Sequence, residues 1–287
     1  MKDYIICTDS ACDIRSDVLK KWDVPCISMT FEFDGDGKIY TENDISIKDF
    51  YDKMRDGGVA RTAAINPDTF KNAFENFVKD GKDVLYLGFS SGLSTTFNSS
   101  RLAAEEVSEA YPERNITVID TLCASAGQGL MVYLAAKKKS EGATLEQTAA
   151  YVKELIPRLC HWFTVDDLEY LKRGGRISSA AALVGSVLSI KPIITVDNEG
   201  HLINTGKVRG RKAAINTLVE KYGQYASDKE GTAFVCHSDC AEDVALLKSE
   251  LCEKYGAKVE LVTDMGPIIG AHVGPGTVAV VFVGKER

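Results

Sequence analysis

The chain has 287 residues, of which 45% are hydrophobic and 26% are charged, and its net charge at neutral pH is -7. This length suits one large α/β domain or two moderate ones, and the apolar content is ample for a packed core. The acidic balance argues against a protein with a broad basic face, so no nucleic-acid partner is expected.

The sequence carries no sign of membrane insertion or export. It has no stretch of about 18 to 20 uninterrupted apolar residues, and Met1–Tyr4 leads into a strand pattern rather than a signal peptide. Most of the eight cysteines lie inside apolar patterns, which indicates buried, reduced thiols. The expected location is therefore the cytoplasm.

Strand and helix patterns alternate through the first half of the chain. This order predicts a mostly parallel sheet with helices on both faces. The turn Asp34–Gly37 predicts a hairpin, and Asn66 and Pro67 predict the N-cap and first residue of a helix that follows the loop 61–66. The expected strands are 4–7, 25–33, 83–89 and 116–119, and the expected helices are 16–21, 46–55, 67–79, 95–109, 125–139 and 145–159.

Three of these strands are followed by loops rich in hydroxyl groups. The loops are Thr8–Ser10, Ser90–Thr96 and Thr121–Ser125. Because parallel strands end at the same edge of a sheet, the loops are expected to face one pocket. Free N–H groups where a loop opens a helix, together with the hydroxyls, would suit a small anion.

The pattern changes after residue 159. A helix through Leu168 and Leu171 precedes the segment Lys172–Ser178, and a small-residue apolar helix is expected over 179–188. The turn 197–200 predicts an antiparallel hairpin. The remaining expected elements are a helix at 212–222, a strand at 232–236, a helix at 241–254, and strands at 258–262 and 277–283. We therefore predict an α/β domain over 1–158 and an α+β domain over 159–287, with a ligand cleft between them.

One motif points to an enzyme. Gly88–Gly92 fits G-x-S-x-G, the turn that carries the nucleophile of α/β-hydrolases, and His272 and Asp264 could complete a triad with Ser90. The helix, however, is expected to begin only at Ser94 or Thr95, where Ser94 could simply be an N-cap. A serine esterase using Ser90 and His272 is therefore the alternative hypothesis.

Two other segments are candidates for ligand contact. Glycine and proline residues surround His272 within 268–276, which predicts a rigid loop with a ligand-facing imidazole, although a packing role is possible for this side chain. The segment Lys207–Lys212 gathers four cations, which indicates either a solvated face or contact with phosphate.

The usual catalytic motifs are missing. The sequence shows no phosphate-binding P-loop, no dinucleotide motif and no convincing acid/base pair, and Cys236–Cys240 lacks the second half of a zinc site. No catalytic residue, metal or cofactor is predicted, and binding is favoured over catalysis. A sensor or transporter-associated binding module is a third hypothesis.

The order of these segments resembles the DegV family of bacterial fatty-acid-binding proteins, the lipid-carrying subunits of fatty acid kinase. The resemblance covers nearly the whole chain. The motifs that carry it are Thr8–Ile14 (T-D-S-x-x-D-L/I), Ser90–Phe97 (S-S-x-L-S-G-T-Y/F), Lys172–Ser178 (K-K/R-G-G-R-I-S), Val208–Ala213 (V-R-x-R-K-K-A) and Ile269–Gly276 (I-G-x-H-x-G-P-G).

The resemblance implies a long-chain fatty acid between the two domains. Its carboxylate would be held by Thr62, Ser94 and His272, with loop N–H groups near Ser94 and Thr95. The chain departs from the family pattern where T-S-Q becomes Thr62-Ala63-Ala64, and where Thr95 replaces a glycine. Chain length and saturation preference are not readable from these residues.

The remaining roles also follow from the resemblance. An ATP-dependent fatty acid kinase is the expected partner, with transient membrane contact as a further option. The tunnel lining is expected from apolar residues beside the loops, namely Ile65, Phe97, Ala126, Leu130, Phe163, Leu168 and Leu183. The docking surface for the kinase or membrane is expected from Arg173, Arg176, Arg209, Arg211 and Lys212.

Overall fold

The computed structural model describes residues 3–177 and 189–287. The helix expected over 179–188, and with it Leu183, lies outside the described residues. Among the residues that are described, no helix has both the length and the apolar content required to cross a membrane.

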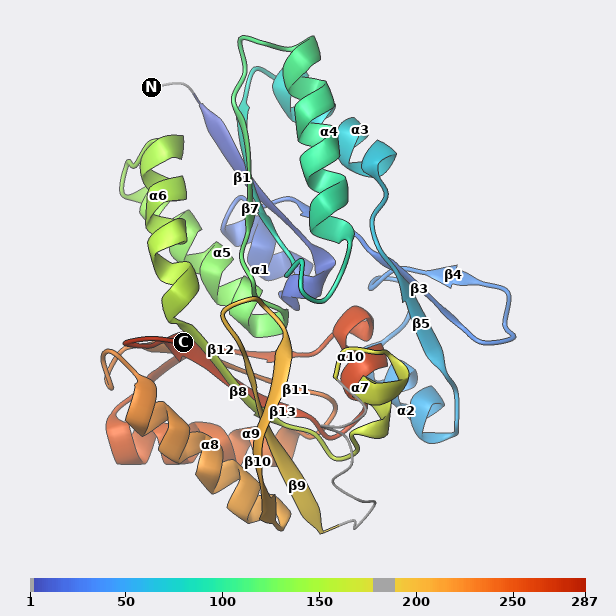
Figure 1. Cartoon of the computed structure of the whole chain (residues 1–287), viewed down its shortest axis with the longest axis vertical. Coiled ribbons are helices and arrows are strands. Elements are labelled where there is room, and N and C mark those ends of the chain that lie inside the picture. The colour runs from blue at the N-terminus through green and yellow to red at the C-terminus, as the bar shows by residue number, and fades with distance from the viewer. Residues whose placement is uncertain (1–2, 178–188) are drawn as a thin grey trace.

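A four-stranded parallel sheet forms the centre of the first half, as predicted (Figure 1). Its two central strands, Tyr4–Asp9 and Asp83–Gly88, are buried on both faces, which suits a sheet covered by helices. Its order is β2 (Cys26–Ile27), β1 (Tyr4–Asp9), β6 (Asp83–Gly88) and β7 (Ile116–Asp120). The helical elements are η1 (Ser10–Cys12), α1 (Ser16–Lys21), α2 (Ile47–Arg55), α3 (Pro67–Lys79), α4 (Thr96–Ala110), α5 (Ser125–Ser140), α6 (Leu145–Leu155) and η2 (Ile156–Arg158).

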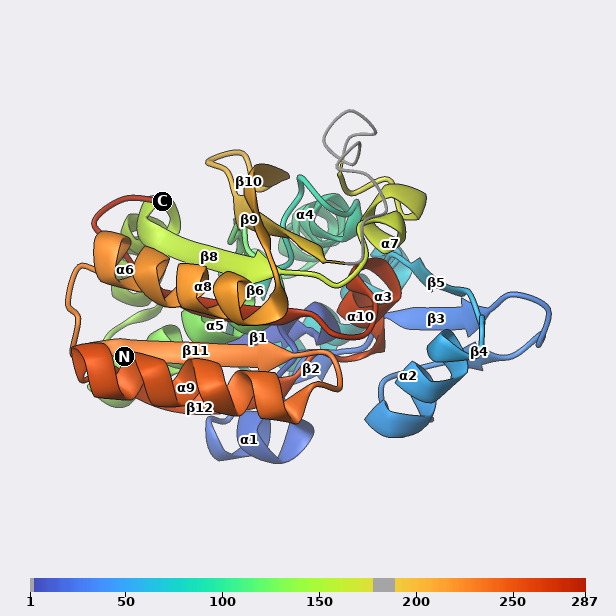
Figure 2. The ribbon, with the colours of Figure 1, turned by 90° about the horizontal axis from the view of Figure 1, so that it is seen from below.

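A small antiparallel sheet lies at one end of the molecule, next to α2 (Figure 2). It consists of β4 (Ile39–Tyr40), β3 (Thr30–Phe33) and β5 (Ala60–Ala63). The predicted hairpin is confirmed, because Phe31 pairs with Tyr40. The segment Arg61–Ala63, expected as a loop, is instead part of β5 and pairs with β3. Four residues are too few for alternation to reveal a strand, and only the tertiary pairing defines it.

The second half contains a six-stranded, mostly antiparallel sheet, in agreement with the predicted α/β plus α+β fold class. The helices α8 and α9 cover one face, and α5 packs between the other face and the parallel sheet (Figures 1 and 2). The sheet order is β10 (Leu202–Arg209), β9 (Ile190–Val196), β8 (Leu159–Thr164), β13 (Val278–Val283), β11 (Thr232–His237) and β12 (Lys258–Asp264). The helices are α7 (Glu169–Arg173), α8 (Arg211–Tyr225), α9 (Ala241–Tyr255) and α10 (Pro267–Val273).

The segment around His272 differs from the expectation of a rigid loop. Residues Pro267–Val273 form the helix α10, with Pro267 at its first position and Gly274 at φ 72° directly after it. Proline starts this helix and glycine ends it, so the residues interpreted as loop signals are helix boundaries. The helix packs against α2, β3 and β5 of the first half. The domain boundary at residue 158 stays a prediction.

Asp13 ties the start of α10 to the first half of the chain. One carboxyl oxygen accepts a hydrogen bond from the N–H of Gly266 at 2.8 Å, and the other accepts from the hydroxyl of Ser125. Asp13 itself has a φ of 52°, an uncommon conformation for a residue other than glycine. Burial raises the pKa of its carboxyl to about 8, although both hydrogen bonds act to lower this pKa.

The raised pKa of Asp13 predicts a pH-dependent stability. Between about pH 4 and pH 8 the native state holds a proton that the unfolded chain releases, so the free energy of unfolding should fall as the pH rises, by up to about 1.4 kcal/mol per pH unit. Asp13→Asn should lack this slope. Urea denaturation from pH 5 to pH 8 measures both proteins, and a wild type that gains stability over Asp13→Asn with rising pH would contradict the prediction.

Candidate functional site

A cavity of about 510 Å³ lies between the two larger sheets and α10. Most of its lining is apolar, and polar side chains gather where β5, α10 and the loop before α4 meet. The apolar wall comes from the six-stranded sheet, α10 and nearby loops, namely Met29, Phe89, Leu93, Phe163, Leu171, Val196, Leu202, Met265, Ile268, Ile269, Val273, Ala279 and Val281.

Thr62 and His272 meet at the polar end of the cavity. The hydroxyl of Thr62 on β5 lies 2.8 Å from Nε2 of His272 on the last turn of α10. Nδ1 of the same ring is buried without a hydrogen-bond partner among the described residues and faces Gly174. A side chain at Gly174 would collide with it, because a Cβ there would lie 2.4 Å from Nδ1.

Ser94 and Thr95 also line the cavity, from the loop that opens α4, and the carbonyl of the preceding Leu93 accepts from Arg176. The Ser94 oxygen accepts from the N–H of Thr96 at 3.2 Å and lies 2.9 Å from the Thr96 hydroxyl. The Thr96 hydroxyl accepts from the N–H of Ile65, which ties this loop to the segment after β5. The structure therefore brings Thr62, Ser94, Thr95 and His272 to one cavity.

Arg176 adds a positive charge to the polar end. It lines the cavity, and its guanidinium donates to the carbonyls of Leu93 and Gly174. Burial, followed by the charges of Arg176 and Arg173, lowers the pKa of His272 to about 4. The imidazole is therefore neutral at pH 7, and the site offers three hydroxyls, a neutral ring and a cation, which suits an anionic group.

The expected hydroxyl loops contribute unequally. Thr8, Ser90 and Thr121 donate to backbone carbonyls within the protein, so these hydroxyls hold the fold together. Ser91, Ser94, Thr95 and Ser125 line the cavity. Sequence alone could not separate the two groups, because both kinds of hydroxyl follow strands of the same sheet edge.

One residue of the expected tunnel lining, Phe163, lines the cavity. Ile65, Ala126, Leu130 and Leu168 are buried and Phe97 is half-buried, and none of these five is among the described residues that line it. Whether an apolar residue lines the cavity depends on the direction in which its side chain points. Ala124, Ser125 and Leu171, which lie close in the sequence to some of the expected residues, do line the cavity.

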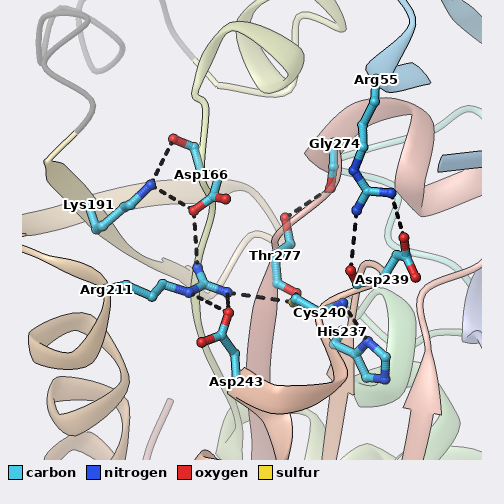
Figure 3. Close-up of polar contacts among 10 residues, drawn as sticks. All are labelled: Arg55, Asp166, Lys191, Arg211, His237, Asp239, Cys240, Asp243, Gly274 and Thr277. Carbon is cyan, nitrogen blue, oxygen red and sulfur yellow. Dashed lines mark hydrogen bonds and ion pairs between the residues drawn. The ribbon is translucent and has the colours of Figure 1, made fainter. Parts of the chain in front are cut away.

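The basic residues divide between the surface and internal ion pairs. Arg173, Arg209 and Lys212 are exposed, whereas Arg176 lines the cavity. Arg211 pairs with Asp243 at 2.9 Å and with Asp166 at 3.4 Å, as Figure 3 shows. The side chain of Arg211 therefore holds α8 against α9 and the end of β8.

Further contacts fix the elements around the α10 helix. Lys191 pairs with Asp166 at 2.7 Å, and Arg55 of α2 pairs with Asp239, which joins the two halves of the chain (Figure 3). The Thr277 hydroxyl donates to the carbonyl of Gly274, directly after α10 (Figure 3).

The esterase triad is not assembled. The Ser90 hydroxyl donates to the carbonyl of Gly200 at 2.9 Å, and the Ser90 side chain is fully buried. Asp264 lies 3.4 Å from Nε2 of His237, and His272 contacts Thr62. A nucleophile needs a base within hydrogen-bond reach, and these three residues each have a different partner. Across 3–177 and 189–287, no three His, Cys, Asp or Glu side chains are grouped as metal ligands would be.

The fold and the cavity define an α/β protein with a mostly apolar cavity between its larger sheets. A family model described as "Uncharacterised protein, DegV family" matches residues 4–285. The chain belongs to the DegV family. It is 43% identical over 289 residues to a DegV domain-containing protein of Clostridium perfringens, covering 100% of this chain and 99% of the relative.

Two solved structures share the fold. One is a DegV family protein from Thermus thermophilus that is described as binding fatty acid. It has a TM-score of 0.88 and 32% identity, and the match covers 98% of this chain and 99% of that one. The Streptococcus pneumoniae fatty acid kinase Fak B3 protein, loaded with linoleic acid, has a TM-score of 0.86 and covers 98% and 99% of the two chains. At 18% identity this second likeness shows the fold alone.

The charges near His272 predict how its pKa should change when each arginine is replaced. The ring should stay neutral through pH 6 to 8 in an NMR titration, with a midpoint near 4. Arg176→Gln should raise this pKa, because a nearby cation disfavours a second positive charge, and Arg173→Gln should raise it less. A pKa that stays the same in both variants would show that burial alone neutralises the ring.

Proposed function

We propose that this protein binds a long-chain fatty acid and presents its carboxyl group to a fatty acid kinase. The observation that carries the proposal is a mostly apolar cavity lined by Thr62, Ser94, Thr95 and His272, in which Thr62 contacts His272. The acyl chain would lie along the apolar wall, and the carboxylate would lie at the polar end.

Magnitudes indicate what each part of the cavity would contribute. Burying about 14 methylenes at about 0.8 kcal/mol each gives a gross gain of about 11 kcal/mol. One hydrogen bond from a neutral hydroxyl contributes a net of about 0.5 to 1.5 kcal/mol. The apolar wall would therefore set most of the affinity, and the polar end would set the orientation of the ligand.

A buried carboxylate is tolerated only when its oxygens receive hydrogen bonds. The hydroxyls of Thr62 and Ser94 can donate to it, and the loop N–H groups near Thr95 add donors. The neutral His272 would orient the Thr62 hydroxyl through the 2.8 Å contact. The charge of Arg176 at the same end would favour the ionised acid.

The relatives support this proposal. The Thermus thermophilus protein, described as binding fatty acid, is 32% identical over nearly the full length. The Streptococcus pneumoniae protein is named as a fatty acid kinase B3 protein, and this name is the reason for proposing a kinase as the partner. In this proposal the chain is a carrier rather than an enzyme, its ligand is the fatty acid, it uses no cofactor, and it works in the cytoplasm, with membrane contact as an optional route of lipid transfer.

Removing hydroxyls at the polar end should weaken fatty acid binding. Thr62→Val and Ser94→Ala are each expected to lower the affinity for palmitate by about tenfold, which corresponds to about 1.4 kcal/mol. Native mass spectrometry of the purified protein checks for a retained acyl adduct, and displacement of a fluorescent fatty acid gives the affinities.

The matched control is Ser91→Ala. Ser91 also lines the cavity, but it has no place in the proposed carboxylate site. Its loss should leave the affinity nearly unchanged. Equal losses in all three variants would contradict a localised carboxylate site, and a wild type that binds no fatty acid would overturn the proposed function.

Arg209 separates kinase docking from lipid binding. Its side chain is exposed, so Arg209→Glu should lower kinase-dependent phosphorylation of the bound fatty acid by about tenfold or more and leave the lipid affinity intact. Lys207→Glu, an equal change of charge two residues away on the same strand, is the control. If both variants lose the same activity, general charge rather than a docking contact is responsible.

A further inference from the structure

The cavity has a second polar region away from His272. It consists of Ser125, His161 and Cys236, which we call the distal cluster, and all three residues line the cavity. The Ser125 oxygen lies 3.5 Å from the sulfur of Cys236. An unsubstituted hydrocarbon chain would offer these polar atoms no hydrogen bond.

Strand register places the distal cluster along the cavity from the carboxylate site. Thr277 contacts the last turn of α10. Cys236 pairs with Ala279, two residues beyond Thr277, and His161 pairs with Val281, four residues beyond it. Four residues of strand correspond to about 13 Å. The distal cluster is therefore expected to face the middle or far part of an acyl chain whose carboxylate is held at His272.

His161 is the least satisfied member of the distal cluster. His161 is only 4% exposed, and neither of its ring nitrogens has a hydrogen-bond partner among the described residues. The carbonyls of Leu159 and Ala124 are nearby, but neither has hydrogen-bonding geometry to the ring, and the Leu159 carbonyl already accepts from Arg287. Burial lowers the pKa of His161 to about 3, so the neutral ring keeps one donor and one acceptor.

The first turn of α5 faces the same region. The N-cap residue Ala124 lines the cavity and has no side chain able to cap the N–H groups of this 16-residue helix. The imidazole of His161 packs against this turn, because a Cβ at Gly127 would lie 1.8 Å from Nε2. Ser125 donates its proton to Asp13, and beyond the 3.5 Å contact with the Cys236 sulfur its oxygen keeps a lone pair.

We propose that the distal cluster binds a hydroxyl group on the acyl chain, so that hydroxylated fatty acids are a ligand class of this protein. This inference rests on the proposed fatty acid binding. A hydroxyl both donates and accepts, which matches a neutral imidazole beside a serine oxygen. A second carboxylate fits less well, because the cluster side chains are uncharged and a buried carboxylate needs more hydrogen-bond donors than they supply.

The test compares stearate with a series of hydroxystearates that carry the hydroxyl at successive mid-chain positions. In the wild type, at least one isomer should bind as tightly as stearate. His161→Phe, which keeps a ring but no nitrogen, should weaken that isomer by about tenfold relative to stearate, and Ser125→Ala should act in the same direction. Val281→Ala is the control, because it removes apolar wall at the same level and should weaken all ligands alike.

The outcomes separate the inference from the function on which it rests. If stearate binds but every hydroxystearate binds at least tenfold more weakly, the inference is overturned and the fatty acid site stands. The inference is also overturned if His161→Phe and Ser125→Ala, shown to be folded by their melting temperatures, leave the ratio of affinities unchanged. If stearate itself fails to bind the wild type, both the function and the inference fall.

Discussion

The buried carboxylate of Asp9 is the interaction on which the arrangement around the cavity depends. It accepts hydrogen bonds from the N–H groups of Ala11 and Phe89, from the hydroxyl of Tyr86 and from the amide of Gln128. These donors belong to η1, the loop after β6, β6 itself and α5. An acceptor that satisfies four buried donors is costly to replace, so one carboxylate fixes the two chain segments that carry Ser94 and Ser125.

The cavity exists because the two larger sheets pack against the same helix, α5. The helix α5 contacts both the parallel sheet and the six-stranded sheet, so the sheets cannot pack directly on each other beside its first turn. The α10 helix closes the remaining side, held by Asp13 and by the Tyr51 hydroxyl, which donates to the carbonyl of Met265 at 2.8 Å. An apolar volume thus remains between rigid elements, with polar groups where loops end.

The electrostatics near His272 suit an anionic group. His272 is kept neutral beside two arginines, so it can serve as a hydrogen-bond partner of Thr62 without adding a titrating charge near neutral pH. Arg211, by contrast, forms ion pairs with Asp166 and Asp243. Cations close together in the sequence therefore have different environments, because Arg211 is held in ion pairs and Arg209 is exposed.

Local sequence patterns predicted most strands and helices in their order, the helix start at Asn66 and Pro67, the parallel sheet with its loops at one edge, and the motifs of the family. These features depend on local periodicity and on residues whose backbone preferences act at short range. Tertiary structure alone decided that residues 60–63 form a strand, that His272 lies on a helix, and which apolar side chains face the cavity. Those outcomes depend on contacts between residues far apart in the chain, such as Thr62 with His272, and local patterns hold no information about which way a buried side chain points.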